Sequence, residues 1–280
     1  MKNSRLIADI DANRGYSGIP TFLRSNICKN LDNIDATYAV LGVPYDEGSP
    51  FVGGSRFCAR SIREHSLRFG GGAIYDIEND KEYLRDAISN NLIVDLGDID
   101  ITPSRGDVTM EKLTSVIKKI IKQKILPIVL GGDHTITYPI VRGFNKPLHV
   151  VQLDAHIDYS KVQEGMKYTN STSFRLLHKL DHVKSLSQVG IRSMRDHKSD
   201  VNDALNNGQA LRYLAEWDGE KASVGLKAVN KESQFYYQAG RENFISFKTE
   251  RYNKTPLVIK GHGAGAEVTA AGVLGDILKC

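Results

Sequence analysis

The feature that most constrains this fold is a regular alternation of short apolar runs with amphipathic stretches over about the first two hundred residues. Short, nearly continuous runs of Val, Ile and Leu are typical of strands that are covered on both faces. The predicted strands are 36–45, 91–99, 125–132, 147–156 and 183–192. These runs are too short for membrane helices, which need ~20 apolar residues.

The stretches between these runs have the pattern of helices. Residues 55–69 form one such stretch, and residues 107–124 place apolar side chains at helical spacing with Lys on the opposite face. Strands that alternate with helices form right-handed crossovers and a parallel sheet. The pattern therefore predicts an α/β layer fold up to about residue 206.

The pattern changes after residue 208, which predicts two domains, 1–207 and 208–280. Residues 211–229 indicate an antiparallel hairpin around a turn at 217–220, and 242–252 and 256–261 are further strand candidates. A glycine-rich turn then opens a predicted helix at 266–279. We therefore expect a small α+β tail after the parallel sheet.

Charge and cysteine content limit the possible partners. Lys and Arg number 37 against 33 Asp and Glu, a formal charge of +4, and this mild excess does not favour nucleic acid. Cys28, Cys58 and Cys280 lie far apart, as expected of reduced thiols. The amino-terminal residues lack the apolar stretch of a signal peptide. We expect a cytoplasmic protein without a membrane or nucleic-acid partner.

Two segments carry potential metal ligands at the ends of predicted strands. LGGDH ends in His134, and LDAHID contains Asp154, His156 and Asp158. Alternate side chains of an extended chain share a face, so the last three should project the same way. Open α/β sheets bind ligands at the carboxyl ends of their strands. Two imidazoles and two carboxylates suit Mn²⁺, Zn²⁺, Co²⁺ or Ni²⁺.

The alternative is structural, because one histidine at a strand end is more often a hydrogen-bonded core residue. Two such motifs about twenty residues apart, each after a buried strand, favour a metal site. Several ionisable groups buried there without a counter-ion would carry a large desolvation cost.

The segments GGDHT and LDAHIDY resemble two signature motifs of the arginase/agmatinase (ureohydrolase) family. GVPYDEGSPFVGGSRFCARSIREHS, DLGDI and VGIRSMRD match flanking pieces of that family in the same order, so the resemblance covers about residues 15–206. It implies a three-layer αβα fold of the arginase/deacetylase type. It also implies a binuclear manganese site that hydrolyses a small guanidino substrate to urea and an amine, with agmatinase as the nearer type.

The resemblance also implies roles for the individual residues. His134 and Asp158 would bind one Mn²⁺, His156 would bind the other, and Asp154 would bridge them. Two metals ~3.5–4 Å apart can hold a hydroxide, to which Asp158, the predicted catalytic residue, would hydrogen-bond. Asp133 would orient the turn or support a metal ligand from behind.

The chain departs from the family pattern in two places. Residues 159–280 lack the third family segment, an Asp-x-Asp strand end followed by Asp-Pro, which would supply two more carboxylates. Asp98 and Asp100 form such a pair, but they precede the GGDH segment. Asn170 occupies the position nearest to the family's proton-shuttle histidine. We therefore expect one Mn²⁺ or none to bind tightly, with impaired activity, in a possible homo-oligomer.

The tail resembles a second family. The order TERY, PLVIKG, GAGAEVTAAGV over about 209–280 is similar to the carboxyl end of homoserine dehydrogenase, including aspartokinase–homoserine dehydrogenases. Gly261, Gly263 and Gly265 would there let the backbone approach a ligand. No GxGxxG follows a strand, so a nucleotide site is not indicated. Three hypotheses result: a manganese guanidino hydrolase, a non-catalytic chimeric or truncated chain with an exposed sheet edge, and a homoserine dehydrogenase fragment.

Overall fold

The structure is a computed structural model, and it describes most of the chain up to residue 208 and several strands beyond it. The described residues are 17–69, 74–77, 80–191, 193, 195–208, 210–212, 216–217, 222–223, 242–247 and 257–262. The chain divides into two compact units, 1–224 and 225–280.

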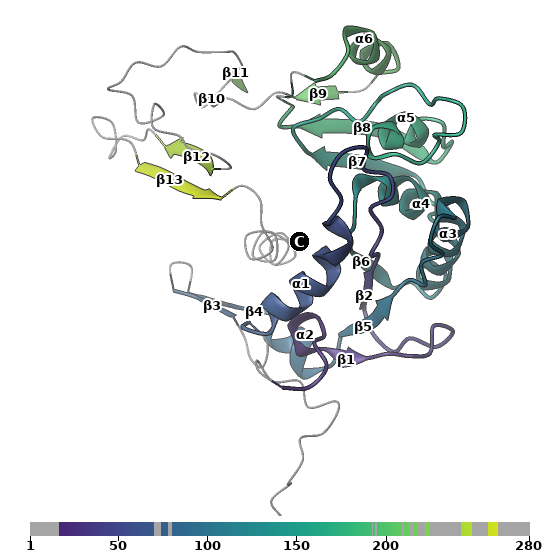
Figure 1. Ribbon diagram of the computed structural model, residues 1–280. Coiled ribbons are helices and arrows are strands. Elements are labelled where there is room, and N and C mark those ends of the chain that lie inside the picture. The colour runs from purple at the N-terminus through teal and green to yellow at the C-terminus, as the bar shows by residue number, and fades with distance from the viewer. Residues whose placement is uncertain are drawn as a thin grey trace, which may run out of the picture. The chain divides into compact units, whose positions relative to one another are not determined.

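The first sheet of the first unit has four parallel strands in the order β1-β5-β2-β6 (Figure 1). These strands are β1 (Asn26–Ile27), β5 (Ile93–Asp98), β2 (Tyr38–Gly42) and β6 (Leu126–Leu130). The predicted parallel arrangement is thereby confirmed, and three of the four strands fall within the predicted apolar runs.

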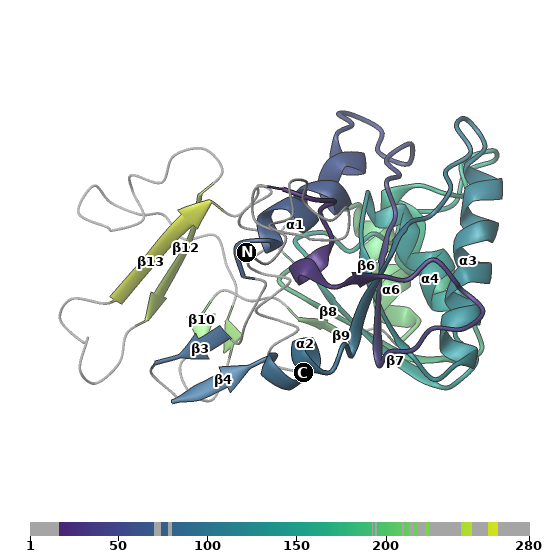
Figure 2. The same ribbon diagram turned by 90° about the horizontal axis from the view of Figure 1, so that it is seen from below.

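Helices lie on both sides of this sheet, α1 (Cys58–Ser66) on one side and α3 (Gly106–Lys122) on the other (Figures 1 and 2). Alternate residues of β2 face opposite sides, so Ala39 and Leu41 join the core cluster of the apolar face of α3. A short helix, η2 (Ser55–Phe57), leads into α1. The predicted helices at 55–69 and 107–124 are confirmed by these elements.

The second sheet has the parallel order β7-β8-β9. Its strands are β7 (Leu148–Leu153), β8 (Val183–Val189) and β9 (Ala210–Arg212), and its helices are α4 (Thr137–Arg142), α5 (Ser173–Leu177) and α6 (Lys198–Asn206). A second core cluster joins Tyr138 of α4, Phe174 of α5, Leu186 of β8 and Ala204 of α6. The same cluster buries Ile157, in the segment that follows β7.

Strands β6 and β7 are edge strands of the two sheets, because each pairs on one side only within the described residues. On β7, Val151 and Leu153 are 63% and 72% exposed. Apolar side chains beside unpaired backbone groups are a template for pairing with another strand.

The remaining elements of the first unit are short. They are η1 (Phe22–Arg24), the antiparallel pair β3 (Ile74–Asp76) and β4 (Lys81–Tyr83), α2 (Arg85–Ser89), η3 (His134–Ile136) and η4 (Asn170–Thr172). None of the described helices is long and apolar enough to span a bilayer. Cys28 and Cys58 are free thiols, as predicted.

In the described part of the chain, two antiparallel strand pairs follow residue 212. Strands β10 (Glu216–Trp217) and β11 (Ala222–Ser223) form the predicted hairpin in the first unit. Strands β12 (Glu242–Phe247) and β13 (Leu257–His262) of the second unit confirm the two later strand predictions. The helix predicted at 266–279 lies outside the described residues.

The division into domains 1–207 and 208–280 stays a prediction. Within the described residues, β9 pairs with β8 at residues 210–212, so the parallel sheet of the first unit extends beyond residue 207.

Candidate metal centre

His134 stands at the tight turn that ends β6. The chain passes through two glycines after Leu130, and a Cβ on Gly132 would lie 1.8 Å from the carbonyl oxygen of Tyr45. The turn is held there because the amide of Asp133 donates to that same carbonyl at 2.7 Å. The close approach requires glycine at position 132 and sets where η3 begins.

Asp133 orients this turn, as predicted. It is the N-cap of η3, and its Oδ1 accepts from the amide of Thr135 at 2.9 Å. Burial raises the pKa of Asp133, and hydrogen bonds from Thr135 and the amide of Gly48 partly offset that rise. Asp133 therefore shapes the turn and does not belong to the cluster of possible ligands.

The three predicted ligands after β7 are not in extended chain, so the alternation argument for them is wrong. Strand β7 ends at Leu153, residues 154–156 form a bend, and Asp158 adopts a left-handed φ of 46°. This bend brings Asp154 and Asp158 to the same place but leaves the side chain of His156 48% exposed.

Three of the four predicted ligands converge at the carboxyl ends of β6 and β7. His134 Nδ1 lies 3.5 Å from Asp154 Oδ2 and is hydrogen-bonded to Asp158 Oδ2. The potential ligand atoms of these three residues all lie within 4.8 Å of one another. Burial alone would lower the pKa of His134, but the hydrogen bond to Asp158 and the neighbouring carboxylates raise it above its ordinary value.

His156 lies next to this group through Asp154. The Oδ1 of Asp154 accepts from the backbone amide of His156 at 2.8 Å and lies 3.1 Å from its Nδ1, while Oδ2 faces His134. Asp154 therefore stands between the two imidazoles, with one oxygen toward each.

Buried amides behind the cluster hold Asp158 in position. Gln152 Nε2 donates to Asp158 Oδ2 at 3.1 Å, and Gln188 of β8 donates in turn to Gln152 and, at 2.6 Å, to the carbonyl of Ile157. Both glutamines are almost fully buried. Such supporting hydrogen bonds fix the orientation of a ligand. No pattern in the sequence indicates this role.

Asp196 is an acidic residue near the cluster that the sequence analysis missed as a site residue. It follows β8, and its Oδ2 is buried without a hydrogen-bond partner. Burial raises its pKa, His156 and the amide of Ile157 lower it, and Asp158 and Asp154 raise it further. Its neighbours are thus residues of the cluster.

Asp98 and Asp100, the two acids that precede the GGDH segment, do not belong to this cluster. Asp98 forms an ion pair with Arg63 at 2.6 Å, and Asp100 pairs with Lys112. They therefore do not replace the missing third segment. Asn170 begins η4, where its amide donates to the carbonyl of Gly48 at 3.2 Å.

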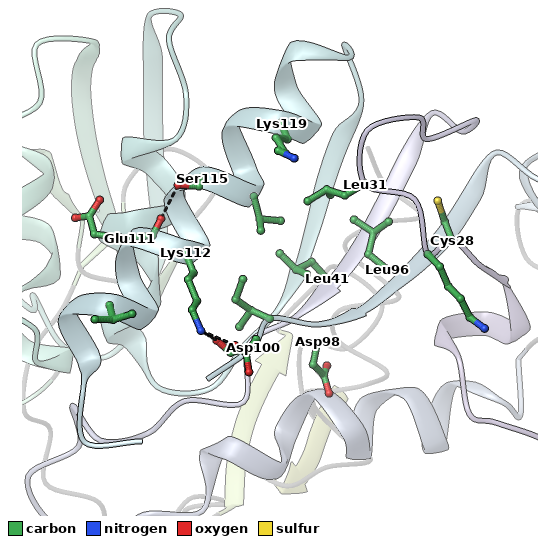
Figure 3. A pocket seen from close by; sticks show the side chains of 14 residues that line it. Cys28, Leu31, Leu41, Leu96, Asp98, Asp100, Glu111, Lys112, Ser115 and Lys119 are labelled. Atoms are coloured by element: carbon green, nitrogen blue, oxygen red, sulfur yellow. Dashed lines mark hydrogen bonds and ion pairs between the residues drawn. The ribbon is translucent and has the colours of Figure 1, made fainter. Parts of the chain in front are cut away.

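Two cavities lie beside these groups. One, of about 460 Å³, is lined by His134, Asp154 and the exposed side chains of β7. The other, of about 630 Å³, lies between α3 and the segment after β1, and shares no lining residue with the first (Figure 3). Its floor is apolar, and the carboxylates that line it carry partners: Arg63 for Asp98, Lys112 for Asp100 and Arg142 for Glu111. Of these two cavities, only the first is lined by candidate ligands, His134 and Asp154.

The loop that precedes α1 is anchored by a buried carboxylate, Asp46. Its Oδ2 accepts from the amides of Gly54 at 2.6 Å and Arg56 at 3.2 Å, and its Oδ1 forms an ion pair with the Arg56 side chain at 2.5 Å. The hydrogen bond from the Arg56 side chain, with the backbone amides, holds the pKa of Asp46 below its usual 3.8.

We expect Asp46→Asn to lower the free energy of unfolding at pH 7 by about 1.5–3 kcal/mol, the range for hydrogen bonds to a charged group. Because the pKa of Asp46 is depressed in the folded state, its contribution is complete above the unfolded value and disappears as pH falls through the folded value. The difference between the variant and the wild type should therefore shrink below about pH 4. Urea denaturation at pH 7 and pH 3 measures it, and an equal difference at both would contradict the assignment.

The donor set fits a divalent transition metal. One imidazole and two carboxylates converge, with a second imidazole adjacent through a shared carboxylate. Mn²⁺, Zn²⁺, Co²⁺ and Ni²⁺ accept such mixed nitrogen and oxygen ligands.

Comparison with known proteins connects this arrangement with one family. Residues 36–246 match the model of the arginase family. An uncharacterised 32.2 kDa protein of Methanothermus fervidus is 32% identical over 224 residues, which cover 79% of this chain and 72% of the relative. An arginase of Glycine max is 35% identical over 184 residues, 62% of this chain and 51% of that enzyme.

A solved structure gives the same result for the fold. Proclavaminate amidino hydrolase from Streptomyces clavuligerus superposes with a TM-score of 0.58 and 27% identity, covering 71% of this chain and 64% of that one. The chain thus spans about half the length of the soybean arginase and just under two thirds of the hydrolase. The predicted arginase-like α/β fold with a parallel sheet is confirmed, and the chain belongs to the arginase family.

Proposed function

We propose that this chain is a manganese-dependent hydrolase that converts a small guanidino compound to urea and an amine. The observation that carries the proposal is the convergence of His134, Asp154 and Asp158 within 4.8 Å at the carboxyl ends of two strands. Membership of the arginase family supports the reaction class. An agmatinase-like substrate preference is the finer part of the proposal.

Each residue of the cluster would have a separate role. His134 and Asp158 would hold one cation and His156 a second, with Asp154 between them. Such cations polarise the substrate and lower the pKa of water toward neutrality. The carboxylates would also attract the cationic guanidinium group. Asp158, fixed by Gln152, would accept a proton from the attacking water and pass it to the departing amine.

The number of available ligands supports weak metal binding. The sequence lacks the third family segment, so two cations would be less neutralised than in a complete site. We propose that one Mn²⁺ or none binds tightly and that turnover is impaired.

Urea release tests this proposal directly. The purified chain is loaded with Mn²⁺, desalted and given agmatine, arginine and a guanidino acid in parallel, with elemental analysis of the same sample. We expect no more than one equivalent of Mn²⁺ and slow, chelator-sensitive urea release, below the ~1 s⁻¹ typical of slower enzymes. Rapid urea release would contradict the impairment, and the absence of metal-dependent urea release from all three substrates would contradict the function.

A non-catalytic chain is the second candidate. The open edges of β6 and β7, with two exposed apolar side chains on β7, favour it within the described part of the chain. A broad thermal melt with aggregation would support it, whereas a sharp melt with a monodisperse peak would count against it.

Other expectations from the sequence stay predictions. The resemblance of 208–280 to homoserine dehydrogenase, a cytoplasmic location and a possible homo-oligomer are among them. NADPH binding would support the first of these. A guanidino compound is the proposed small-molecule partner, with no nucleic-acid or membrane partner expected.

A further inference from the structure

Within the described residues, no protein group hydrogen-bonds to one carboxylate oxygen of Asp196. Its Oδ2 is fully buried and accepts no hydrogen bond, although the residue lies in a polar loop after β8. A buried charged oxygen without a partner carries a large desolvation cost. Each such group therefore needs an explanation.

The loop that carries Asp196 is fastened to the segment that carries the ligands. The amide of Ser193 donates to the carbonyl of Ala155 at 2.9 Å, and the amide of Arg195 donates to Ser193 Oγ at 3.1 Å. The amide of Ile157 hydrogen-bonds to the Asp196 carboxylate. These bonds fix the carboxylate against the 154–158 segment, next to His156.

Charge around the cluster is unbalanced in a way that a cation would correct. Asp158 is paired with His134, and Asp154 with His156. Asp196 lies within electrostatic reach of both other carboxylates and brings a third negative charge. Like charges that share a partly buried site repel one another unless an opposite charge lies between them.

We propose that Asp196 is a further ligand of the metal centre, on the side of His156, where it supplies part of the negative charge that the missing third segment would have provided. The inference rests on the proposed function, because it assumes that the cluster binds a cation. Asp196 follows β8, so the proposed ligands would come from the segments after three strands, β6, β7 and β8.

The test is Asp196→Asn, with Asp181→Asn as the matched control. Asp181 is exposed at the turn before β8, so its substitution makes the same charge change away from the cluster. Mn²⁺ is titrated into each protein, and free Mn²⁺ is followed by its electron paramagnetic resonance signal. We expect Asp196→Asn to weaken binding at least ~10-fold or to remove one equivalent, while Asp181→Asn binds as the wild type does.

Thermal melts without metal provide the second measurement. Removing an unpaired buried charge should leave the melting temperature of metal-free Asp196→Asn equal to or above that of the wild type. A ligand role therefore predicts lost metal affinity without lost stability, whereas a structural role predicts lost stability.

The outcomes separate the two proposals. Equal Mn²⁺ affinity in the wild type and Asp196→Asn would overturn the inference and leave the proposed function standing. A metal-free variant that melts lower than the wild type would overturn it too. Absence of metal binding in the wild type and both variants would overturn the proposed function, and the inference with it.

Discussion

Asp154→Asn is expected to abolish tight metal binding and any urea release above the buffer background. Asp154 has one carboxylate oxygen toward each imidazole, so a neutral amide at this position weakens both sides of the cluster at once. Loss of an outer-shell partner alone typically costs 10–100-fold in affinity, so we expect a loss of more than about 100-fold for this residue.

Isothermal titration with Mn²⁺ measures the effect, and Glu164→Gln is the control. Glu164 is an exposed acid in the loop that follows the cluster, so its substitution removes the same charge without touching the site. A binding curve for Asp154→Asn that overlays that of the control would show that the cation binds elsewhere.

Arg63→Ala is expected to lower the free energy of unfolding by about 3–5 kcal/mol, the cost of leaving a buried charge unpaired. The Arg63 guanidinium donates to both oxygens of Asp95, to Asp98 and to the carbonyl of Gly97. Asp95 is only 1% exposed, so removal of the guanidinium leaves a buried carboxylate without its counter-ion.

The neighbouring Arg60 provides the control on the same helix. Arg60 pairs with Glu64 one turn later, and both side chains are largely exposed, at 80% and 46%. Exposed pairs of this kind contribute only about 0.3–0.5 kcal/mol. Chemical denaturation of Arg63→Ala and Arg60→Ala should therefore differ severalfold in the lost stability. Similar losses would mean that Asp95 finds another partner.

The sequence predicted the layers of the fold well, because periodicity reports which side chains must be buried. Strands β2, β5, β6, β7 and β8 fall within predicted runs, and α3 matches the predicted amphipathic stretch within two residues at each end. Helices α4 and α6 were not predicted. They have six and nine residues and so complete few helical turns.

The sequence predicted which residues form the site but not how the backbone arranges their side chains. The motifs identified His134, Asp154 and Asp158, yet the argument from an extended strand was wrong because Asp158 adopts a left-handed backbone that no residue pattern reveals. Asp196 was missed for a related reason. It sits in the polar run of residues 195–200, and only the packing of that loop against Ala155 and Ile157 brings it to the cluster.

The break between the two sheets has a mechanical consequence for this cluster. His134 follows β6 of one sheet and Asp154 follows β7 of the other, so no ladder of backbone hydrogen bonds sets their spacing within the described residues. A cation held by both residues would link the ends of two strands that belong to different sheets. The affinity of the site for the cation would then depend on how rigidly the two strand ends are held. Removal of the cation would lower the local stability of both strands and not only of the site.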